Sequence, residues 1–171
     1  MRWLLIFLIF CIVWVGVLST NADLSNLLAK ALPKDVQEKL EATKKVYYTT
    51  PEKSKEAIVY LNSRIPNYIV WDEKCYKFAM FRAKDMVFRK YFDHKTPEGK
   101  MFNEFAPKFD LPSQGIGECI VIHIGVENKD LEKLSIETWI RSYDHAKILK
   151  SCNRGAIACY DNICVFIGRL V

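Results

Sequence analysis

The N-terminal apolar run constrains this chain most, because it decides the compartment in which the rest of the chain folds. Arg2 is followed by uninterrupted apolar residues from Trp3 to Leu18. Such a segment is a secretory signal or a membrane anchor. It is somewhat shorter than the roughly 20 apolar residues that span a bilayer, and the small residues Thr20 and Ala22 favour cleavage after Ala22.

An uncleaved anchor is the alternative for residues 1–22, with Arg2 on the cytoplasmic side as the positive-inside bias orients it. Both readings export the remainder, so we expect an extracellular or cell-surface protein. Half of the 171 residues are hydrophobic, which supplies a sizeable core for one domain. The 25 Lys and Arg residues are dispersed and barely outnumber the 20 Asp and Glu residues, so no nucleic-acid partner is predicted.

Export favours disulfides over free thiols. Outside the apolar run the chain has an odd number of cysteines, so at least one stays unpaired. The cysteines outside the apolar run are Cys75, Cys119, Cys152, Cys159 and Cys164.

One pair follows from local pattern. Two apolar, strand-like segments flank Asp161-Asn162, residues that tolerate the positive φ of a tight hairpin turn. A two-residue loop places Cys159 opposite Cys164 at a non-hydrogen-bonded position, close enough for a disulfide. The loop that it closes is short, so its stabilisation should be at the low end of roughly 2–4 kcal/mol. A zinc site that adds Cys152 to this pair is the alternative, although the C-x4-C spacing is a weak metal signal.

Residues 23–54 are expected to form an amphipathic helical linker, either a stalk or a helix packed on the domain. Its apolar residues recur with a helical period before Pro33, and Thr49-Thr50-Pro51 marks a boundary. The residues with that period are Leu24, Leu27, Leu28, Ala31 and Leu32.

Residues 55–171 have the pattern of a mixed domain. A first helix buries the face of Ala57, Ile58, Leu61 and Ile65 and stops at Pro66. Asp72 caps a longer helix. The inward residues of this longer helix are Phe78, Ala79, Arg82, Ala83, Met86 and Val87.

The second half of the domain adds strands. Residues 119–126 are apolar and β-branched enough for a strand. Asp130 caps a helix with Leu131, Leu134, Thr138 and Trp139 inward, and the C-terminal hairpin follows. This order predicts an α+β fold or an α/β/α sandwich.

Two histidine motifs, Tyr91–Gly99 and Trp139–Leu149, flank Gly117-Glu118. The imidazoles of His94 and His145 with the Glu118 carboxylate form a set that suits Zn²⁺ or another divalent metal, with an open position for water. Alternatively, both histidines donate hydrogen bonds that hold loops, with Glu118 as the buried acceptor. His123, inside an apolar run, is expected to be a partly buried, hydrogen-bonded residue, and Trp139 a core anchor.

The ordered motifs from Trp71-Asp72 through Phe92-x-His94 and Gly117-Glu118 to Trp139-x-x-Ser142-x-x-His145 resemble the CAP superfamily of cysteine-rich secretory, antigen-5 and pathogenesis-related proteins, especially its short prokaryotic secreted members. The resemblance covers roughly residues 55–170. It implies a three-layer α-β-α sandwich whose cleft holds His94, Glu118 and His145, with Ser142 beside them.

Two positions depart from the family pattern. Cys119 stands where many members have asparagine, and could pair with Cys75 or Cys152. Ser142 stands where the eukaryotic branch often has a second cleft glutamate, and Glu137 points to another side of its helix. A nucleophilic pair of Ser142 and His145 lacks an identifiable oxyanion motif or orienting acid.

Three functions are therefore weighed. The favoured one is a non-enzymatic exported module that binds a protein, a lipid, a small apolar ligand or a metal ion. The second is a metal-assisted hydrolase that uses His94, His145 and Glu118, although no second acid is evident if Glu118 binds the metal. The third is a structural surface protein held at the membrane by an uncleaved N-terminal segment.

Overall fold

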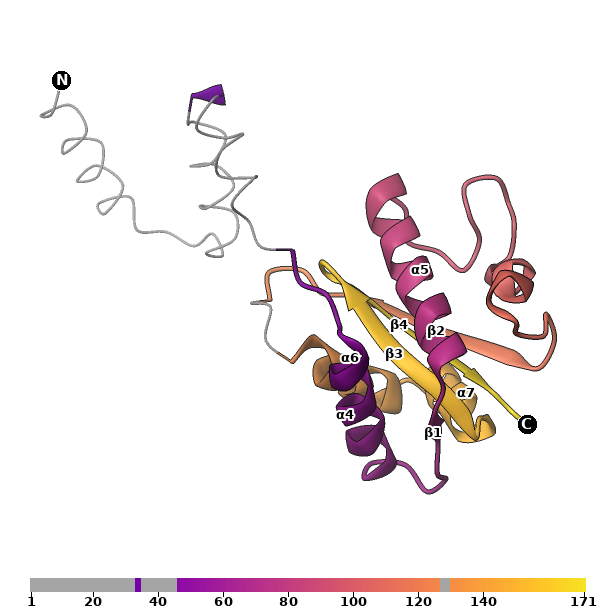
Figure 1. The fold of residues 1–171 in the computed structure, drawn as a ribbon. Coiled ribbons are helices and arrows are strands. Elements are labelled where there is room, and N and C mark those ends of the chain that lie inside the picture. Colours follow the sequence, from indigo (N-terminus) through magenta and orange to yellow (C-terminus); the bar gives the residue numbers. More distant parts are fainter. Residues whose placement is uncertain (1–32, 35–45, 127–129) are drawn as a thin grey trace, which may run out of the picture. The chain divides into compact units, whose positions relative to one another are not determined.

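A four-stranded mixed sheet forms the centre of the domain (Figure 1). Its strands are β1 (Val70–Trp71), β2 (Ile116–Ile122), β3 (Arg154–Tyr160) and β4 (Ile163–Arg169). They lie in the order β1-β3-β4-β2. The short β1 runs parallel to β3, and the other two pairings are antiparallel.

This computed structural model describes residues 33–34, 46–126 and 130–171. The chain divides into the units 1–45 and 46–171, and the second contains the sheet and the helices that cover it. The predicted signal peptide or anchor and the apolar helical face of residues 24–32 lie outside the described residues. No helix in the described ranges is long and apolar enough to cross a membrane.

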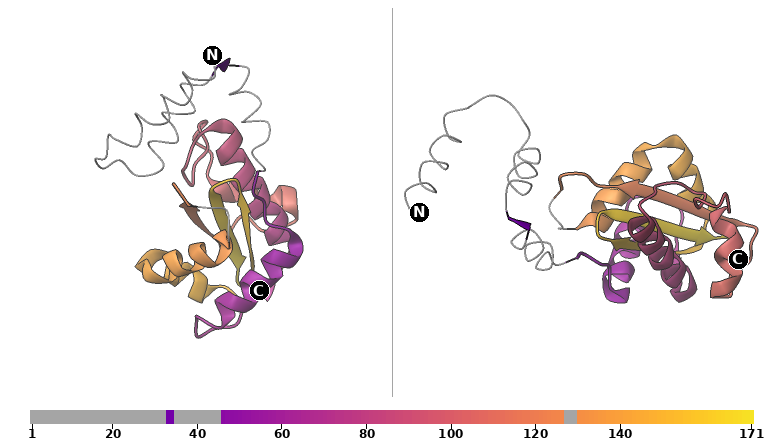
Figure 2. Two further views of the ribbon diagram at one scale, coloured as in Figure 1. Left: turned by 90° about the vertical axis from the view of Figure 1, so that its left-hand side faces the viewer. Right: turned by 90° about the horizontal axis from the view of Figure 1, so that it is seen from above.

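Helices cover both faces of the sheet (Figure 2). α5 (Glu73–Arg89) and the 3-10 helix η1 (Phe102–Phe109) lie on one face, and α6 (Leu131–Arg141) and α7 (Tyr143–Ser151) lie on the other. α4 (Pro51–Asn62) packs beside β3 and α6. The predicted α-β-α sandwich is confirmed.

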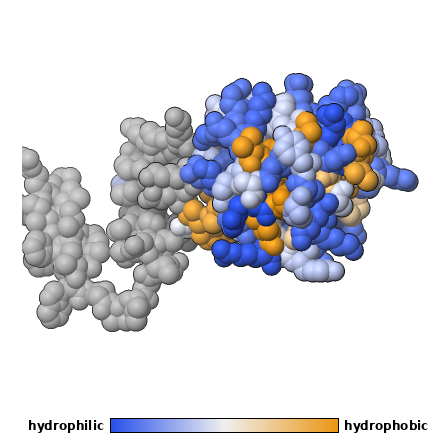
Figure 3. Space-filling view, turned by 90° about the horizontal axis from the view of Figure 1, so that it is seen from below, coloured by the Kyte–Doolittle hydropathy of each residue, from blue (hydrophilic) through white to orange (hydrophobic). Residues whose placement is uncertain are grey.

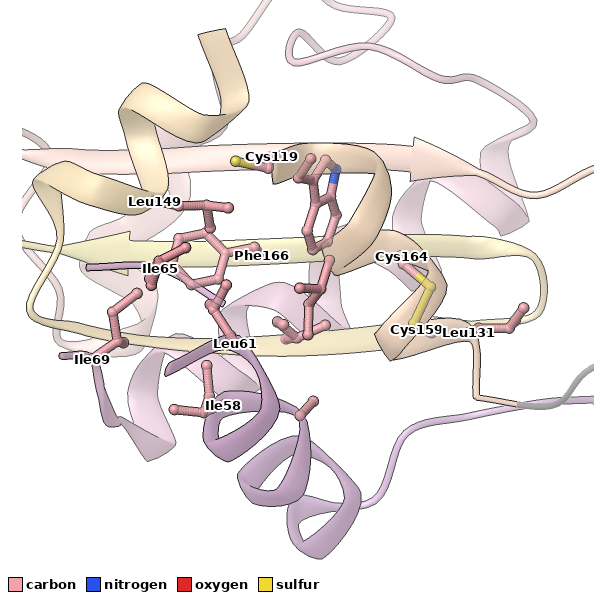
Figure 4. Packing of buried hydrophobic residues seen from close by; sticks show 14 of the residues in the cluster. Ile58, Leu61, Ile65, Ile69, Cys119, Leu131, Leu149, Cys159, Cys164 and Phe166 are labelled. Carbon is pink, nitrogen blue, oxygen red and sulfur yellow. A yellow bond between two sulfur atoms is a disulfide. The ribbon is translucent and has the colours of Figure 1, made fainter. Parts of the chain in front are cut away.

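The sheet separates two apolar cores because successive side chains of each strand point to opposite faces. On β3, Ile157 and Cys159 join the core of α4, α6 and α7, where Trp139 is fully buried as predicted. Figure 4 shows Leu61, Leu149 and Phe166 in this core. Ala156 and Ala158 join the core of α5 and η1. The small alanines allow α5 to lie close to the sheet.

The C-terminal hairpin has the predicted register. Tyr160 pairs with Ile163, and Cys159 pairs with Cys164, to which it is joined by a disulfide. Asp161 has the positive φ of 52° that the tight turn requires. The alternative zinc site is excluded, because two of its three thiols form this bond. The described cysteines outside it, Cys75, Cys119 and Cys152, are free and buried.

Replacing both Cys159 and Cys164 with alanine should lower the free energy of unfolding by about 2 kcal/mol, because the disulfide closes a short loop. Urea titration of the purified protein measures this. A reductant should destabilise the wild type by a similar amount and leave the double variant unchanged. Equal sensitivity of both proteins to reductant would contradict the prediction.

The start of the domain lies upstream of Lys55, where the family resemblance begins. Tyr47 and Thr49 are buried, and Tyr48 forms a β-bridge with Tyr160. The hydroxyls of Tyr47 and Thr49 donate to the buried Glu132 of α6, at 2.6 and 2.5 Å. Two hydroxyl donors thus satisfy this buried carboxylate. Residues 46–50 are thus attached to the sheet and to α6.

Local capping signals are partly confirmed. The Asp72 carboxylate accepts hydrogen bonds from the backbone of Lys74 and Cys75 and so caps α5 as predicted. Asp130 is the N-cap residue of α6, but its side chain makes no capping hydrogen bond. Thr50, at the predicted boundary, is the N-cap of α4 and accepts from the Lys53 backbone.

Three predicted details were wrong. The first helix was predicted to carry Ile65 and to stop at Pro66, whereas α4 ends at Asn62 and Ile65 is buried in the bend that follows. The strand predicted at 119–126 is β2 at 116–122, which ends where Ile122 pairs with Ile163, the first residue of β4. Because β4 begins at Ile163, it has no residue with which β2 could pair beyond Ile122. In α6 the predicted inward residues Leu134 and Thr138 are exposed. The inward face is instead rotated to Leu131, Glu132, Ser135, Ile136 and Trp139, because Tyr47 and Thr49 hold Glu132 inside.

Candidate functional site

Glu118 lies at the centre of the candidate site, on edge strand β2. Its side chain is 0% exposed, and each carboxylate oxygen has its own partner. Oε1 accepts from Arg82 Nε at 2.7 Å, and Oε2 lies 2.7 Å from His94 Nδ1. Burial of a carboxylate is costly unless it is paired and hydrogen-bonded, and both conditions are met here.

Arg82 also belongs to the site, although the sequence motifs did not predict it there. It projects from α5, is fully buried, and also donates to the Tyr91 hydroxyl at 2.6 Å and to the Asp93 carbonyl at 2.9 Å. Tyr91 in turn donates to Asp85. The signal for this network was present in the sequence: an arginine at an inward position of an apolar helix face needs a buried anionic partner.

His94 is held in the loop after α5. Its carbonyl accepts from the Phe102 backbone at 2.9 Å, and Lys95 and Met101 form a β-bridge that closes the loop. Gly99 turns the loop with a φ of 82°, a conformation that suits glycine. The His94 side chain is 42% exposed, so one edge of the ring faces Glu118 while part of it reaches solvent.

His145 lies on α7, and α7 packs on the opposite face of β2 from α5. A Cβ at Gly117 would meet Ile148 Cγ2 at 2.5 Å, so the glycine of the Gly117-Glu118 motif allows α7 to approach the strand. The carbonyl of His145 accepts a weak bond from Cys119 Sγ at 3.8 Å. Its Nδ1 lies 2.9 Å from Ser142 Oγ, which follows the last residue of α6.

The structure therefore brings His94 and Glu118 into direct contact, while His145 bonds Ser142 instead. Within the described residues, no three His, Cys, Asp or Glu side chains are grouped so that they could hold a metal ion together. Glu137 pairs with Arg64 and Tyr60 at the surface, so it does not supply a second cleft carboxylate.

The two imidazoles have opposite pKa shifts. The hydrogen bond to Glu118 raises the pKa of His94 above its ordinary value of 6.5. Burial lowers the pKa of His145, and the nearby charge of His94 lowers it further. We therefore expect the two rings to lie near each other, around the edge of β2. Burial alone lowers the pKa of His123, whose Nε2 lies 2.8 Å from Ser135 Oγ, as expected of a buried histidine.

An NMR titration of the metal-free protein should show His94 titrating above 6.5, and His145 and His123 below it. His94→Gln should raise the pKa of His145 by removing a nearby positive charge, and should leave His123 unchanged. An unaltered His145 would contradict the shared neighbourhood.

The same shifts determine how stability depends on pH. The contribution of His94 is complete below 6.5 and is lost as the pH rises through its raised folded pKa. The contributions of His145 and His123 are present above 6.5 and are lost as the pH falls through their lowered folded pKa values.

The free cysteines have no sign of reactivity. Burial raises the pKa of the Cys75 thiol to about 12 and raises the pKa of Cys119 and of Cys152 above the usual range. Because the thiolate is the reactive form, these three residues act as core side chains.

No protein-family model and no curated protein matches this sequence. Among solved structures, the chain is similar to an extracellular protein containing an SCP domain from Bacillus anthracis, with a TM-score of 0.56 and 20% sequence identity. The match covers 72% of this chain and 44% of that one, so this chain spans less than half the length of that protein. An outer surface protein from Borrelia burgdorferi matches with a TM-score of 0.48 and 19% identity, over 74% of this chain and 100% of that one. The first likeness establishes the fold alone.

Proposed function

We propose that this chain, whose domain has the CAP (SCP-like) fold, is an exported binding module without enzymatic activity. The environment of Glu118 carries the proposal. A general base must be free to take a proton from water, yet both oxygens of this buried carboxylate are occupied by Arg82 and His94. Because Arg82 and His94 occupy both oxygens, neither is placed to take a proton from water, which disfavours the hydrolase alternative.

The two imidazoles are the polar groups left for a ligand. Their Nδ1 atoms face Glu118 and Ser142, which leaves the Nε2 atom of each ring for another partner. At metal sites, the ring nitrogen of a histidine that does not bind the metal commonly donates a hydrogen bond to a carboxylate, which orients the imidazole. His94 and His145 would hold a divalent ion such as Zn²⁺ with water at the remaining positions, and Glu118 would orient His94. A bound ion would supply a positive centre for an electron-rich group of the ligand.

Zinc titration of the purified protein tests this part of the proposal. We expect the wild type to bind one zinc ion, and His94→Ala and His145→Ala each to abolish binding. Glu118→Gln should weaken binding by about 10–100-fold, because it removes the orienting partner. Glu137→Gln is the matched control at a surface carboxylate and should have no effect. A folded wild type that binds no zinc would mean that the histidines only hold their loops, and the ligand would then be a protein or an apolar molecule.

Turnover assays test the non-enzymatic part. We expect no hydrolysis of activated esters or of unfolded protein substrates above the rate in buffer, with or without zinc. Hydrolysis that both His94→Ala and Glu118→Gln abolish, while both variants remain folded, would contradict the proposal and restore the hydrolase.

Export and anchoring are tested by cell fractionation. The apolar run from Trp3 to Leu18 supports export, and Thr20 and Ala22 support cleavage. We expect a mature form that begins at Asp23 outside the cell. A full-length protein retained in the membrane fraction would instead support a surface protein held by residues 1–22.

A further inference from the structure

Exposed apolar side chains gather at the end of the sheet that carries the β3–β4 turn. We call them the hairpin-end patch: Tyr48, Phe88, Phe92, Ile122 and Ile124. Ile124 is 81% exposed and Phe88 is 66% exposed. By comparison, the face of the domain seen from below in Figure 3 carries separate apolar groups between hydrophilic ones. Contiguous exposed apolar patches mark interaction sites.

Contacts around the turn connect the members of the hairpin-end patch. The rings of Phe88 and Tyr160 lie 5.3 Å apart, and Tyr160 forms the β-bridge with Tyr48. On the other side of the turn, Ile122 pairs with Ile163. The backbone of His123 donates to Asn162 at 2.9 Å, which holds the following residues, including Ile124, beside the turn.

A shallow groove of about 310 Å³ lies within this end of the domain. Met86, Val87 and Phe92 line it from the α5 side, and Ile122 and Ile163 line it from the sheet. Its lining is therefore largely apolar.

Cationic side chains border the apolar surface. Lys90 lines the groove beside the acidic Asp161, and Lys84 Nζ lies 5.3 Å from the Tyr160 ring. Aromatic and aliphatic side chains next to lysines are the composition of surfaces that lie in the headgroup region of a bilayer.

The chain also enters the domain at this end. The backbone of Asp161 donates to the Tyr47 carbonyl at 2.8 Å, so the segment that begins at Val46 leaves from beside the hairpin turn. Upstream, residues 19–45 connect this point to the apolar run from Trp3 to Leu18. In the alternative in which the run is retained as an anchor, the chain leads from the anchor to this end of the domain.

We propose that the hairpin-end patch docks on a phospholipid bilayer, with Phe88, Ile122 and Ile124 in the interfacial region and Lys84 and Lys90 against anionic headgroups. The occupant is a lipid surface because apolar side chains, bordering lysines and the entry of the chain coincide at one end. The side chains of His94 and His145 are not members of the patch, and the docking does not rest on the proposed binding at these two residues.

The test uses the expected mature form, which begins at Asp23, with vesicles of phosphatidylcholine and phosphatidylglycerol, so that binding does not depend on the apolar run. An environment-sensitive fluorophore is attached through Ile124→Cys, or through Val59→Cys on α4 as the control, since Val59 is 71% exposed and outside the patch. The other cysteines are buried or disulfide-bonded, so they should not react. Far-UV circular dichroism and retention of the disulfide check folding.

At position 124 we expect a blue-shifted emission and about threefold stronger quenching by nitroxide-labelled lipid than at position 59, as for a side chain in the interface. Phe88→Ser should reduce the quenching at position 124, and Lys84→Gln with Lys90→Gln should reduce it in anionic vesicles more than in pure phosphatidylcholine. Equal quenching at both positions would overturn the proposal. A blue shift without quenching would also overturn it, because the patch would then be covered by protein, such as a second copy of the chain.

Discussion

Glu118→Ala lowers the free energy of unfolding by about 3–5 kcal/mol, the cost of leaving one partner of a buried ion pair without the other. Arg82 is fully buried, and its Nε would lose the carboxylate oxygen at 2.7 Å. The His94 ring would lose its acceptor as well. Arginine keeps its charge under ordinary conditions, so this loss cannot be relieved by deprotonation. Urea unfolding followed by circular dichroism measures the effect.

Glu137→Ala is the matched control, because it removes a carboxylate that pairs with an arginine at the surface. The Arg64 side chain in that pair is 48% exposed, so we expect a loss of at most about 1 kcal/mol. The double variant Glu118→Leu with Arg82→Leu should lose less than the two single variants combined, since no isolated charge remains. A loss after Glu118→Ala no larger than that of the control would contradict the buried pair.

Gly155→Ala should lower the free energy of unfolding by about 3 kcal/mol, at the upper end for inserting a methyl group into a packed core. A Cβ at this position would meet two ring atoms of Phe166 at 2.8 Å and the backbone oxygen of Ile167 at 2.9 Å. Gly168 stands opposite Gly155 in the β3–β4 pair, and a Cβ there would also meet the Phe166 ring. The ring lies over both glycines, so neither strand has room for a side chain here.

Gly115→Ala separates the effect of packing from that of backbone freedom. Gly115 has a φ of 68° and no atom within 4 Å of its added Cβ, so only backbone strain of about 1 kcal/mol is expected. Combining Gly155→Ala with Phe166→Leu should recover part of the loss, because the ring contacts disappear while the Ile167 oxygen stays. Additive losses in this cycle would contradict the proposed clash.

Several features were predictable because residues close in sequence determine them. The Cys159–Cys164 disulfide follows from a two-residue turn at Asp161-Asn162, which sets the register of both strands. The cap at Asp72 depends on the next two backbone amides. The sandwich was expected from the order of helices and strands and from the resemblance to CAP proteins.

The candidate site was predictable in its members and not in its contacts. The motifs singled out His94, Glu118 and His145, and the first two are in contact. The sequence did not reveal that Arg82 neutralises Glu118, since the partner of an inward arginine depends on which strand lies beneath its helix. The burial of Glu132 depends in the same way on hydroxyls more than 80 residues away in the chain.

By itself the sequence determined the hairpin, its disulfide and the mixed helix and strand pattern, because local sterics and periodicity act over a few residues. Tertiary structure decided that α5 and α7 lie on opposite faces of β2. As a result His94 reaches Glu118, whereas His145 bonds Ser142. The physical reason is that the side chains of a strand alternate between its two faces. Motif spacing shows which residues belong to a site, but their contacts depend on which helix packs on which face of the sheet.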